Sequence, residues 1–209
     1  MACGAGPAGE DEGSRAQRHK LFNLVQAMRM TGGVEGMVVE CGCYLGLSAF
    51  VTCSYLRGDG PWKGEGYHVF DSFEGISALG DKDGLDDARI PIGKQTRRAG
   101  LFKTTLDQVK GSLAEFPSIT FHPGWLPDSL AGAPDGPYRF VHLDLDVHEP
   151  TKAALEYFHP RLAPGGIVVM DDYGALRWPG VRDAVDTYAA ARDTRVLPLS
   201  SSQALVFAG

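Results

Sequence analysis

Carboxylates that follow short apolar runs are the residues of this chain best suited to chemistry. Four such runs carry an acid at or near their carboxyl ends. The acids are Glu40, Asp71, Asp144 and the pair Asp171 and Asp172. Neighbouring carboxylates repel one another unless a cation or a proton compensates them. If the fold gathers these acids, they form a site for a cation or for a positively charged ligand.

The first acid opens a glycine-rich turn at residues 40–48. Glycine after a strand lets a ligand approach the backbone closely, and the helix that follows presents free N–H groups. The spacing differs from the G-x-G-x-x-G of dinucleotide sites, which disfavours a nicotinamide-dependent oxidoreductase. An acid here suits a cationic ligand, and Asp71 can accept hydrogen bonds from two ribose hydroxyls. S-adenosylmethionine, which has a cationic end, a ribose and no phosphate, meets both demands. The turn reads Glu40-x-Gly42-x-Tyr44-x-Gly46-x-Ser48.

The remaining acids suggest a metal site. Asp144 with Asp171 and Asp172 offers the oxygen ligands that Mg²⁺ prefers. Such an ion orients a diol and lowers the pKa of a coordinated hydroxyl. The alternative is that Asp171 and Asp172 cap a turn through side-chain hydrogen bonds.

The elements that must position these residues alternate between strand and helix, which predicts an α/β fold with a mostly parallel, doubly wound sheet and helices on both faces. In such sheets ligands bind outside the carboxyl ends of the strands, so the acids should share one cleft. A long loop at residues 77–100 is either a solvated excursion or a lid. The expected strands are 37–41, 69–71, 119–121, 140–144 and 167–171, and the expected helices after the first strand are 45–56, 104–116, 151–162 and 181–191.

Composition describes one ordinary globular domain. The chain has 209 residues, of which 44% are hydrophobic and 22% charged. The net charge of −6 disfavours nucleic acid as a partner, because binding phosphates needs a concentrated basic surface. We find no apolar run long enough for a signal peptide or a membrane span, and we expect a cytoplasmic protein without a membrane partner.

The N-terminal residues differ from the rest. Residues 1–17 are rich in Gly, Ala, Glu and Asp, which predicts a disordered tail before a domain spanning residues 18–209. A first helix follows, in which Leu21, Phe22 and Val25 keep helical spacing. This helix can pack on its own chain or pair with another copy. The four cysteines read as reduced thiols, with those at 41, 43 and 53 buried.

Five ordered motifs resemble the macrocin O-methyltransferase (TylF-like) family. The resemblance covers the chain from about Val38 to Tyr188, and the turn at residues 40–48 is also similar to that of catechol O-methyltransferases. The motifs are VFDSFEG at 69–75, GWLPDSL at 124–130, FVHLDLDVHEPT at 140–151, PGGIVVMDDY at 164–173 and PGVRDAV at 179–185.

The resemblance implies a class I, Rossmann-like methyltransferase fold. Its sheet would have seven strands, and the last two, near residues 195–199 and 204–207, would form an antiparallel hairpin. Pro198 lacks an N–H, so we expect the first of these strands to be short or to hold Pro198 at an unpaired position.

The resemblance also implies roles for particular residues. Asp144, Asp171 and Asp172 would ligate Mg²⁺, and Asp144 would also be the general base. The turn and the second strand would bind S-adenosylmethionine, with Asp71 on the ribose. The implied cofactor residues are Glu40, Gly42, Tyr44, Gly46, Ser48 and Asp71, with Ser72, Phe73 and Trp125 as walls for the adenosine.

The expected function is therefore methyl transfer to a hydroxyl of a small polar acceptor, such as a sugar or a natural product. One alternative is a metal-independent methyltransferase, and another is a non-catalytic module that binds S-adenosylmethionine. The family often has Tyr where this chain has His148, so the part played by His148 and by Asp146 stays open, as does the oligomeric state.

Overall fold

The computed structural model describes residues 12–84 and 99–209. Its first helix, α1 (Glu12–Met30), begins six residues before Arg18, where we expected the fold to start. The expectation of a tail over residues 1–17 is therefore wrong for 12–17, whose Arg, Ala and Gln are good helix formers. Residues 1–11 of that tail and 85–98 of the expected loop lie outside the described residues.

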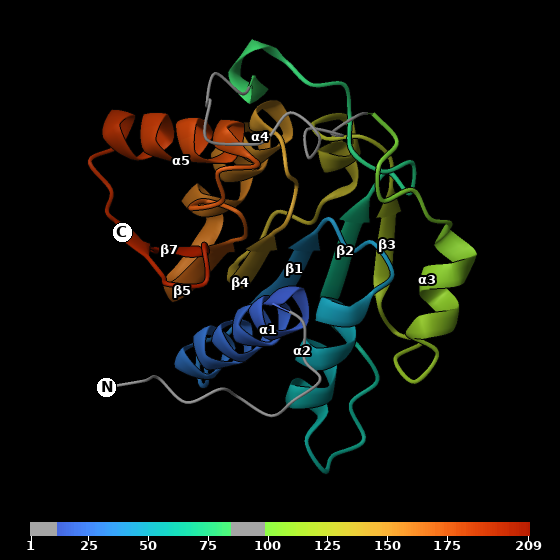
Figure 1. Ribbon diagram of the computed structural model, residues 1–209. Helices are drawn as coiled ribbons and strands as arrows, with labels where there is room; N and C mark the ends of the chain where they lie inside the picture. Colours follow the sequence, from blue (N-terminus) through green and yellow to red (C-terminus); the bar gives the residue numbers. More distant parts are fainter. Residues whose placement is uncertain (1–11, 85–98) are drawn as a thin grey trace, which may run out of the picture.

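A seven-stranded sheet forms the centre of the molecule (Figure 1), in the order β3-β2-β1-β4-β5-β7-β6. The strands β1 to β5 pair in parallel, and β7 runs antiparallel to both β5 and β6. This confirms the expected mixed sheet and its terminal hairpin. The strands are β1 (Met37–Cys41), β2 (Tyr67–Asp71), β3 (Thr120–Pro123), β4 (Tyr138–Leu143), β5 (Leu162–Met170), β6 (Val196–Pro198) and β7 (Ala204–Phe207).

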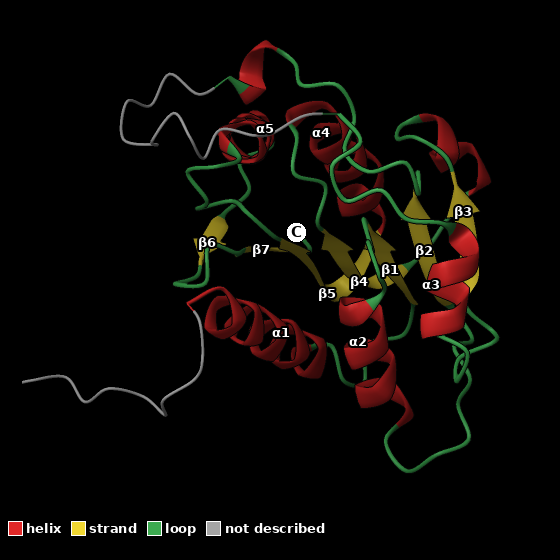
Figure 2. Cartoon of the chain, turned by 45° about the vertical axis from the view of Figure 1, so that its right-hand side comes forward, coloured by secondary structure: helices red, strands yellow, loops and turns green. Residues whose placement is uncertain are grey.

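Helices cover both faces of this sheet, as Figures 1 and 2 show. The helices α1, α2 and α3 pack on one face, and α4 and α5 pack together on the other. The helices after α1 are α2 (Leu47–Arg57), α3 (Leu106–Ser112), α4 (His148–Phe158) and α5 (Pro179–Ala191), with short 3-10 helices at Asp81–Asp83, Asp128–Gly132 and His159–Arg161.

Helix boundaries differ from those expected by a few residues, and the differences are largest at α3 and α4. The helix α3 is shorter than the predicted 104–116, because Thr105 caps its start by accepting a hydrogen bond from the Gln108 N–H. The helix α4 begins at His148, before the predicted residue 151, since Pro150 in the first turn needs no hydrogen bond from its nitrogen.

The core follows the alternation of side chains along each strand. Val39, Phe70 and Val141 belong to the cluster beneath α4 and α5, whereas the residues one position earlier on β1, β2 and β4 face the other way. A parallel sheet covered on both faces buries both sets. The helix α1 packs on its own chain through buried Leu24 and Met28. Cys41, Cys43 and Cys53 are buried free thiols, as expected.

The hairpin at the C-terminal edge meets the constraint set by Pro198. The strand β6 has three residues, lies at the edge of the sheet and places Pro198 at its end. None of the helices in the described ranges is long and apolar enough to cross a membrane.

Candidate active site

A cavity of about 560 Å³ opens at the carboxyl ends of the central strands. This is the position that the parallel topology predicts for a ligand. Nine of the residues expected at the site line it, contributed by β2, by the turn after β1 and by the segments that follow β3, β4 and β5. They are Gly42, Tyr44, Ser48, Asp71, Ser72, Trp125, Asp144, Asp171 and Asp172.

Gly42 is required by the close approach of two backbone segments. Its φ of +82° is disfavoured for any residue with a side chain. A Cβ added at this position would lie 1.9 Å from the carbonyl oxygen of Asp144. The chain segments after β1 and β4 can therefore meet only through a glycine, and this contact places Asp144 beside the turn.

Asp71 is held in a fixed orientation by the backbone. Its Oδ2 accepts hydrogen bonds from the N–H groups of Cys43 (2.8 Å) and Tyr44 (3.3 Å), and its Oδ1 accepts one from Phe73 (2.7 Å). A carboxylate has about four lone-pair directions, so this arrangement orients Asp71 and leaves acceptor capacity facing the cavity.

Glu40 takes a different place from the one the sequence suggested. The side chain is fully buried, accepts hydrogen bonds from Ser48 Oγ and from Tyr67 Oη (2.6 Å), and lies 3.7 Å from His142 Nδ1. Side-chain alternation turns Glu40 toward α2 instead of toward the cavity. It therefore supports the turn after β1 from behind. Burial raises the pKa of Tyr67 well above its usual range, and the charge of Glu40 adds to this, which keeps the phenol protonated as the donor.

Two other expected residues also lie behind the cavity wall. Gly46 precedes α2 with a φ of +84°, and it is buried against Leu113. Phe73 is 6% exposed and belongs to the core beneath α2. Ser72 does line the cavity, but its hydroxyl closes a local turn by donating to the Gly75 carbonyl.

Carboxylates gather on the floor of the cavity. Ligand oxygens of Asp144, Asp146 and Asp172 lie within 4.8 Å of one another, and Asp144 forms a second such group with His142 and Asp171. Asp146 and Asp172 have φ angles of +63° and +61°. Backbone strain of this kind clusters at functional sites, where the surrounding structure holds it in place.

The pKa values of these acids shift in opposite directions, because some lie beside other acids and Asp171 lies beside positive groups. Burial and the negative charges of Asp171 and Asp172 raise the pKa of Asp144 well above its usual range. Burial and Asp172 raise the pKa of Asp146 to about 8. Burial also opposes ionisation of Asp171, but hydrogen bonds and positive charge from His142 and Lys20 outweigh it and lower its pKa to about 2.

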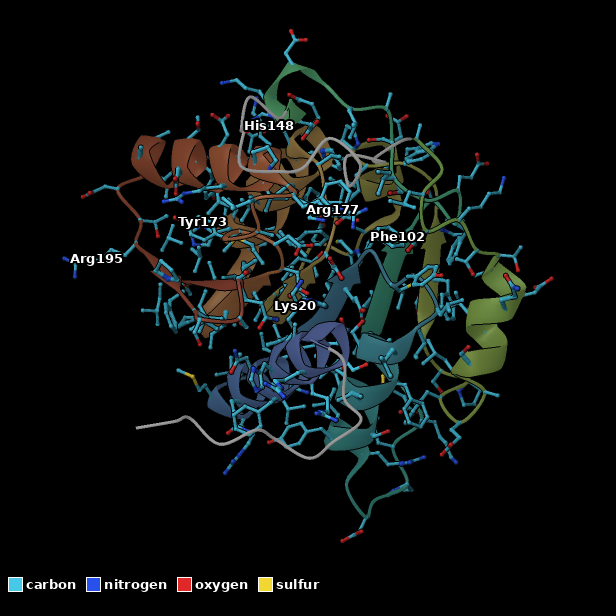
Figure 3. All side chains as sticks on the ribbon, viewed as in Figure 1. Lys20, Phe102, His148, Tyr173, Arg177 and Arg195 are labelled. Atoms are coloured by element: carbon cyan, nitrogen blue, oxygen red, sulfur yellow. The ribbon has the colours of Figure 1, made fainter. Side chains whose placement is uncertain are left out.

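Three residues that orient Asp171 were not assigned to the site from the sequence. Gln203 at the start of β7 donates to Asp171 Oδ1 (2.7 Å), His142 Nε2 lies 3.3 Å from the same oxygen, and Lys20 Nζ lies 3.2 Å from Oδ2. Burial lowers the pKa of His142, but Asp171 and Glu40 outweigh it and raise it to about 10. Figure 3 shows Lys20 extending from α1 toward the strand ends.

His148 lies apart from Lys20, near the top of Figure 3. Its Nδ1 is 2.9 Å from Glu149, its Nε2 is 3.1 Å from Asp183 on α5, and its backbone N–H donates to Asp83 (2.8 Å). These contacts connect α4 to α5 and to the 3-10 helix that contains Asp83. The structure thus gives His148 a structural place, whereas Asp146 lines the cavity.

The acidic cluster has the donor chemistry of a site for a hard divalent cation. The close group of Asp144, Asp146 and Asp172 supplies only oxygen ligands, which Mg²⁺ prefers. Burial and the neighbouring negative charges both raise the pKa of Asp144, and a bound cation would offset those charges. The residues therefore fit Mg²⁺.

Comparison with known proteins gives three related findings. The model of the family described as macrocin-O-methyltransferase (TylF) matches residues 14–200. The 8-demethyl-8-(2,3-dimethoxy-alpha-L-rhamnosyl)-tetracenomycin-C 4'-O-methyltransferase of Streptomyces olivaceus is 34% identical over 81% of this chain. Demethyldecarbamoylnovobiocin O-methyltransferase of Streptomyces niveus is 29% identical over 83%. The chain spans 64% and 66% of the lengths of these two relatives.

Solved structures agree with the fold. The structure of the O-methyltransferase NovP superposes with a TM-score of 0.73 and 27% sequence identity, covering 90% of this chain and 78% of NovP. The class I methyltransferase fold expected from the motifs is confirmed.

Proposed function

The chain belongs to the macrocin O-methyltransferase (TylF) family, and on that premise we propose that it transfers a methyl group from S-adenosylmethionine to a hydroxyl of a sugar or natural product. The observation that carries the proposal is the cavity itself, in which Asp71 and the Gly42 turn lie on one side and the carboxylate cluster on the other. One side suits a cationic nucleoside, and the other suits a metal-bound acceptor.

The cofactor would bind along the turn after β1. Asp71, already oriented by three backbone N–H groups, would accept a hydrogen bond from a ribose hydroxyl through its remaining lone pair. Gly42 would let the cofactor approach the backbone. Trp125, which is 40% exposed at the cavity, would pack against the adenine. Glu40 and Tyr67 would act indirectly by holding Ser48 and the turn in place.

We assign the Mg²⁺ ligands to Asp144, Asp171 and Asp172. In the structure Asp144 lies within ligand distance of both other acids, but in two separate groups, one with Asp171 and His142 and one with Asp172 and Asp146. Asp146 is therefore a further candidate ligand. When bound, the ion would orient the acceptor and make its hydroxyl more acidic. Gln203 and His142 would keep Asp171 ionised and in place. Outer partners of this kind are needed because a ligand carboxylate that rotates away loses the metal.

Methyl transfer would follow from proximity and from removal of one proton. The hydroxyl oxygen would attack the methyl carbon in line with the departing sulfur, which leaves as the neutral thioether of S-adenosylhomocysteine. The hydroxyl proton would pass to a carboxylate on the cavity floor. We assign that role to Asp144, since it belongs to both groups of closely spaced ligand atoms. The Asp146→Asn variant tests whether the neighbouring carboxylate, and not Asp144, accepts this proton.

The acceptor would combine a hydroxylated part with an apolar part. Beside the acids, the cavity is lined by Leu126, Val147 and Trp178. Tyr44 and Phe102 stand at the cavity with exposures of 46% and 39% and contact each other edge to face at 5.4 Å. Exposed aromatic groups beside a cluster of acids suit a glycoside that carries an apolar ring system; the printed name of the Streptomyces olivaceus relative includes a rhamnosyl group on tetracenomycin C.

The direct test is a transfer assay with radiolabelled S-adenosylmethionine and Mg²⁺. The acceptors would be 8-demethyl-8-(2,3-dimethoxy-alpha-L-rhamnosyl)-tetracenomycin C and demethyldecarbamoylnovobiocin. We expect label in at least one acceptor, loss with excess chelator, and loss in Asp144→Asn, which keeps the shape of the side chain and removes its charge.

The two alternatives give different results in the same assay. A metal-independent methyltransferase would keep its turnover under excess chelator. A non-catalytic module would bind S-adenosylhomocysteine but label neither acceptor, with or without Mg²⁺. Either result would overturn the corresponding part of the proposal.

A further inference from the structure

Lys20 on α1 occupies a position among the carboxylates of the cavity. Its Nζ lies 2.8 Å from Asp172 Oδ1 and 3.2 Å from Asp171 Oδ2, and its side chain is 19% exposed. The side chain is therefore a cation held directly against two of the proposed metal ligands.

Lys20 is not a surface residue that happens to approach an acid. The residues before it on α1, from 13 to 19, are exposed, whereas Lys20 is partly buried and lines the cavity. Its backbone carbonyl is also held, because it accepts a hydrogen bond from Gln203 Nε2 (3.3 Å), the same side-chain nitrogen that donates to Asp171. The side-chain amide of Gln203, just before β7, thus connects α1 to the acidic cluster.

The charges on the cavity floor show what Lys20 does there. Asp144, Asp146, Asp171 and Asp172 lie close together, and His142 contacts Asp171 from the side of the sheet. The ammonium group of Lys20 approaches from α1, and it contacts carboxylate oxygens of both Asp171 and Asp172. A divalent cation at the proposed site would draw on oxygens of the same two carboxylates.

We propose that Lys20 is a resident counter-ion of the carboxylate cluster, which a divalent cation must displace when it binds. The competition depends on the metal site of the proposed function. Lys20 would keep Asp171 and Asp172 together while the metal is absent, and it would weaken the affinity of the site for the metal. The affinity of the site for the divalent cation then depends on Lys20 of α1 as well as on the carboxylate ligands.

The first test is a titration of the whole protein with Mn²⁺ as a probe for Mg²⁺, followed by electron paramagnetic resonance of the free ion. Lys20→Met removes the charge and keeps most of the side chain. We expect it to tighten Mn²⁺ binding at least tenfold. Arg15→Met, which removes a charge from an exposed position of the same helix, should change the affinity less than twofold. Equal or weaker Mn²⁺ binding by Lys20→Met would overturn the proposal.

A second measurement uses the unmodified chain, so it does not depend on how the variant folds. Acetylation of lysines by an N-hydroxysuccinimide ester, followed by mass spectrometry, reports how free each amine is. Saturating Mg²⁺ should speed acetylation of Lys20 several-fold and leave exposed Lys63 unchanged. An unchanged or slower rate at Lys20, in a sample that binds Mn²⁺, would refute the competition.

Failure of the metal site itself gives a separate pattern. If neither the natural chain nor Lys20→Met binds Mn²⁺, the proposed metal site and the competition are both wrong. Titration of S-adenosylhomocysteine in the same samples then decides whether the cofactor half of the proposed function stands.

Discussion

Replacing Gly42 by alanine tests how the cavity is built. Alanine in the left-handed region costs about 1–2 kcal/mol. The added Cβ would also lie 1.9 Å from the Asp144 carbonyl oxygen, far inside contact distance, so the backbone must move. Overpacking of this kind typically costs about 1–3 kcal/mol. We therefore expect Gly42→Ala to lower the free energy of unfolding by about 2–5 kcal/mol.

Gly33 provides a matched control for this change. Its φ of +90° is close to the +82° of Gly42, but an added Cβ would meet no atom of the described residues within 4 Å. Gly33→Ala should therefore show only the conformational cost of about 1–2 kcal/mol. Urea unfolding followed by circular dichroism measures both variants against the natural chain.

The same pair of variants separates stability from binding. Gly42→Ala displaces Asp144 and narrows the turn after β1. We therefore expect the affinity of this variant for S-adenosylhomocysteine to fall at least tenfold, whereas Gly33→Ala should bind normally. If the two variants unfold at the same urea concentration and bind equally well, the close approach of the two segments does not shape the site.

Three further changes test the groups around the cavity. Tyr67→Phe removes the donor to Oε2 of the buried Glu40, while Ser48 still donates to Oε1, and should lower the free energy of unfolding by about 1–3 kcal/mol, measured in urea. The Asp171 pKa of about 2 lies below the ordinary 3.8, so its stabilisation is complete above pH 4 and is lost as the pH falls toward 2. Asp171→Asn should remove that part of the pH dependence, about 2 kcal/mol, in unfolding measured between pH 2 and 6. Gln203→Leu should raise the Asp171 pKa, seen by carboxyl NMR titration, and an unchanged value would contradict the role of this amide.

Much of the fold could be predicted because buried parallel strands have a clear sequence pattern. The run at 37–41 was predicted with the bounds of β1, since it is apolar and ends before a glycine turn. Helix ends were less certain because they depend on single caps. The start of α3 is set by Thr105, and Pro150 is accommodated in the first turn of α4.

The site was predictable where it depends on strand ends and not where it depends on the direction of a side chain. Asp71, Asp144 and Asp171 follow strands whose ends meet, so their convergence follows from topology. Glu40 precedes the end of β1 by one residue, and the alternation of the strand turns it into the core. A full assignment of strand faces would have indicated this.

Lys20 and Gln203 could not be recognised from the motifs. They lie 151 and 32 residues from Asp171 along the chain and reach it only because α1 and β7 pack beside the same strand end. A lysine on an amphipathic helix and a glutamine before a strand are both ordinary surface residues in sequence terms. Only the structure shows that they face the acids.

Titration of S-adenosylhomocysteine into the whole protein by calorimetry tests the central claim most directly. We expect a dissociation constant of about 1 μM or lower, equivalent to roughly −8 kcal/mol. Asp71→Asn, which removes the charge that faces the ribose, should weaken binding at least tenfold. The absence of heat and of any thermal shift at millimolar ligand, with and without Mg²⁺, would contradict the assignment of this cavity to the methyl donor.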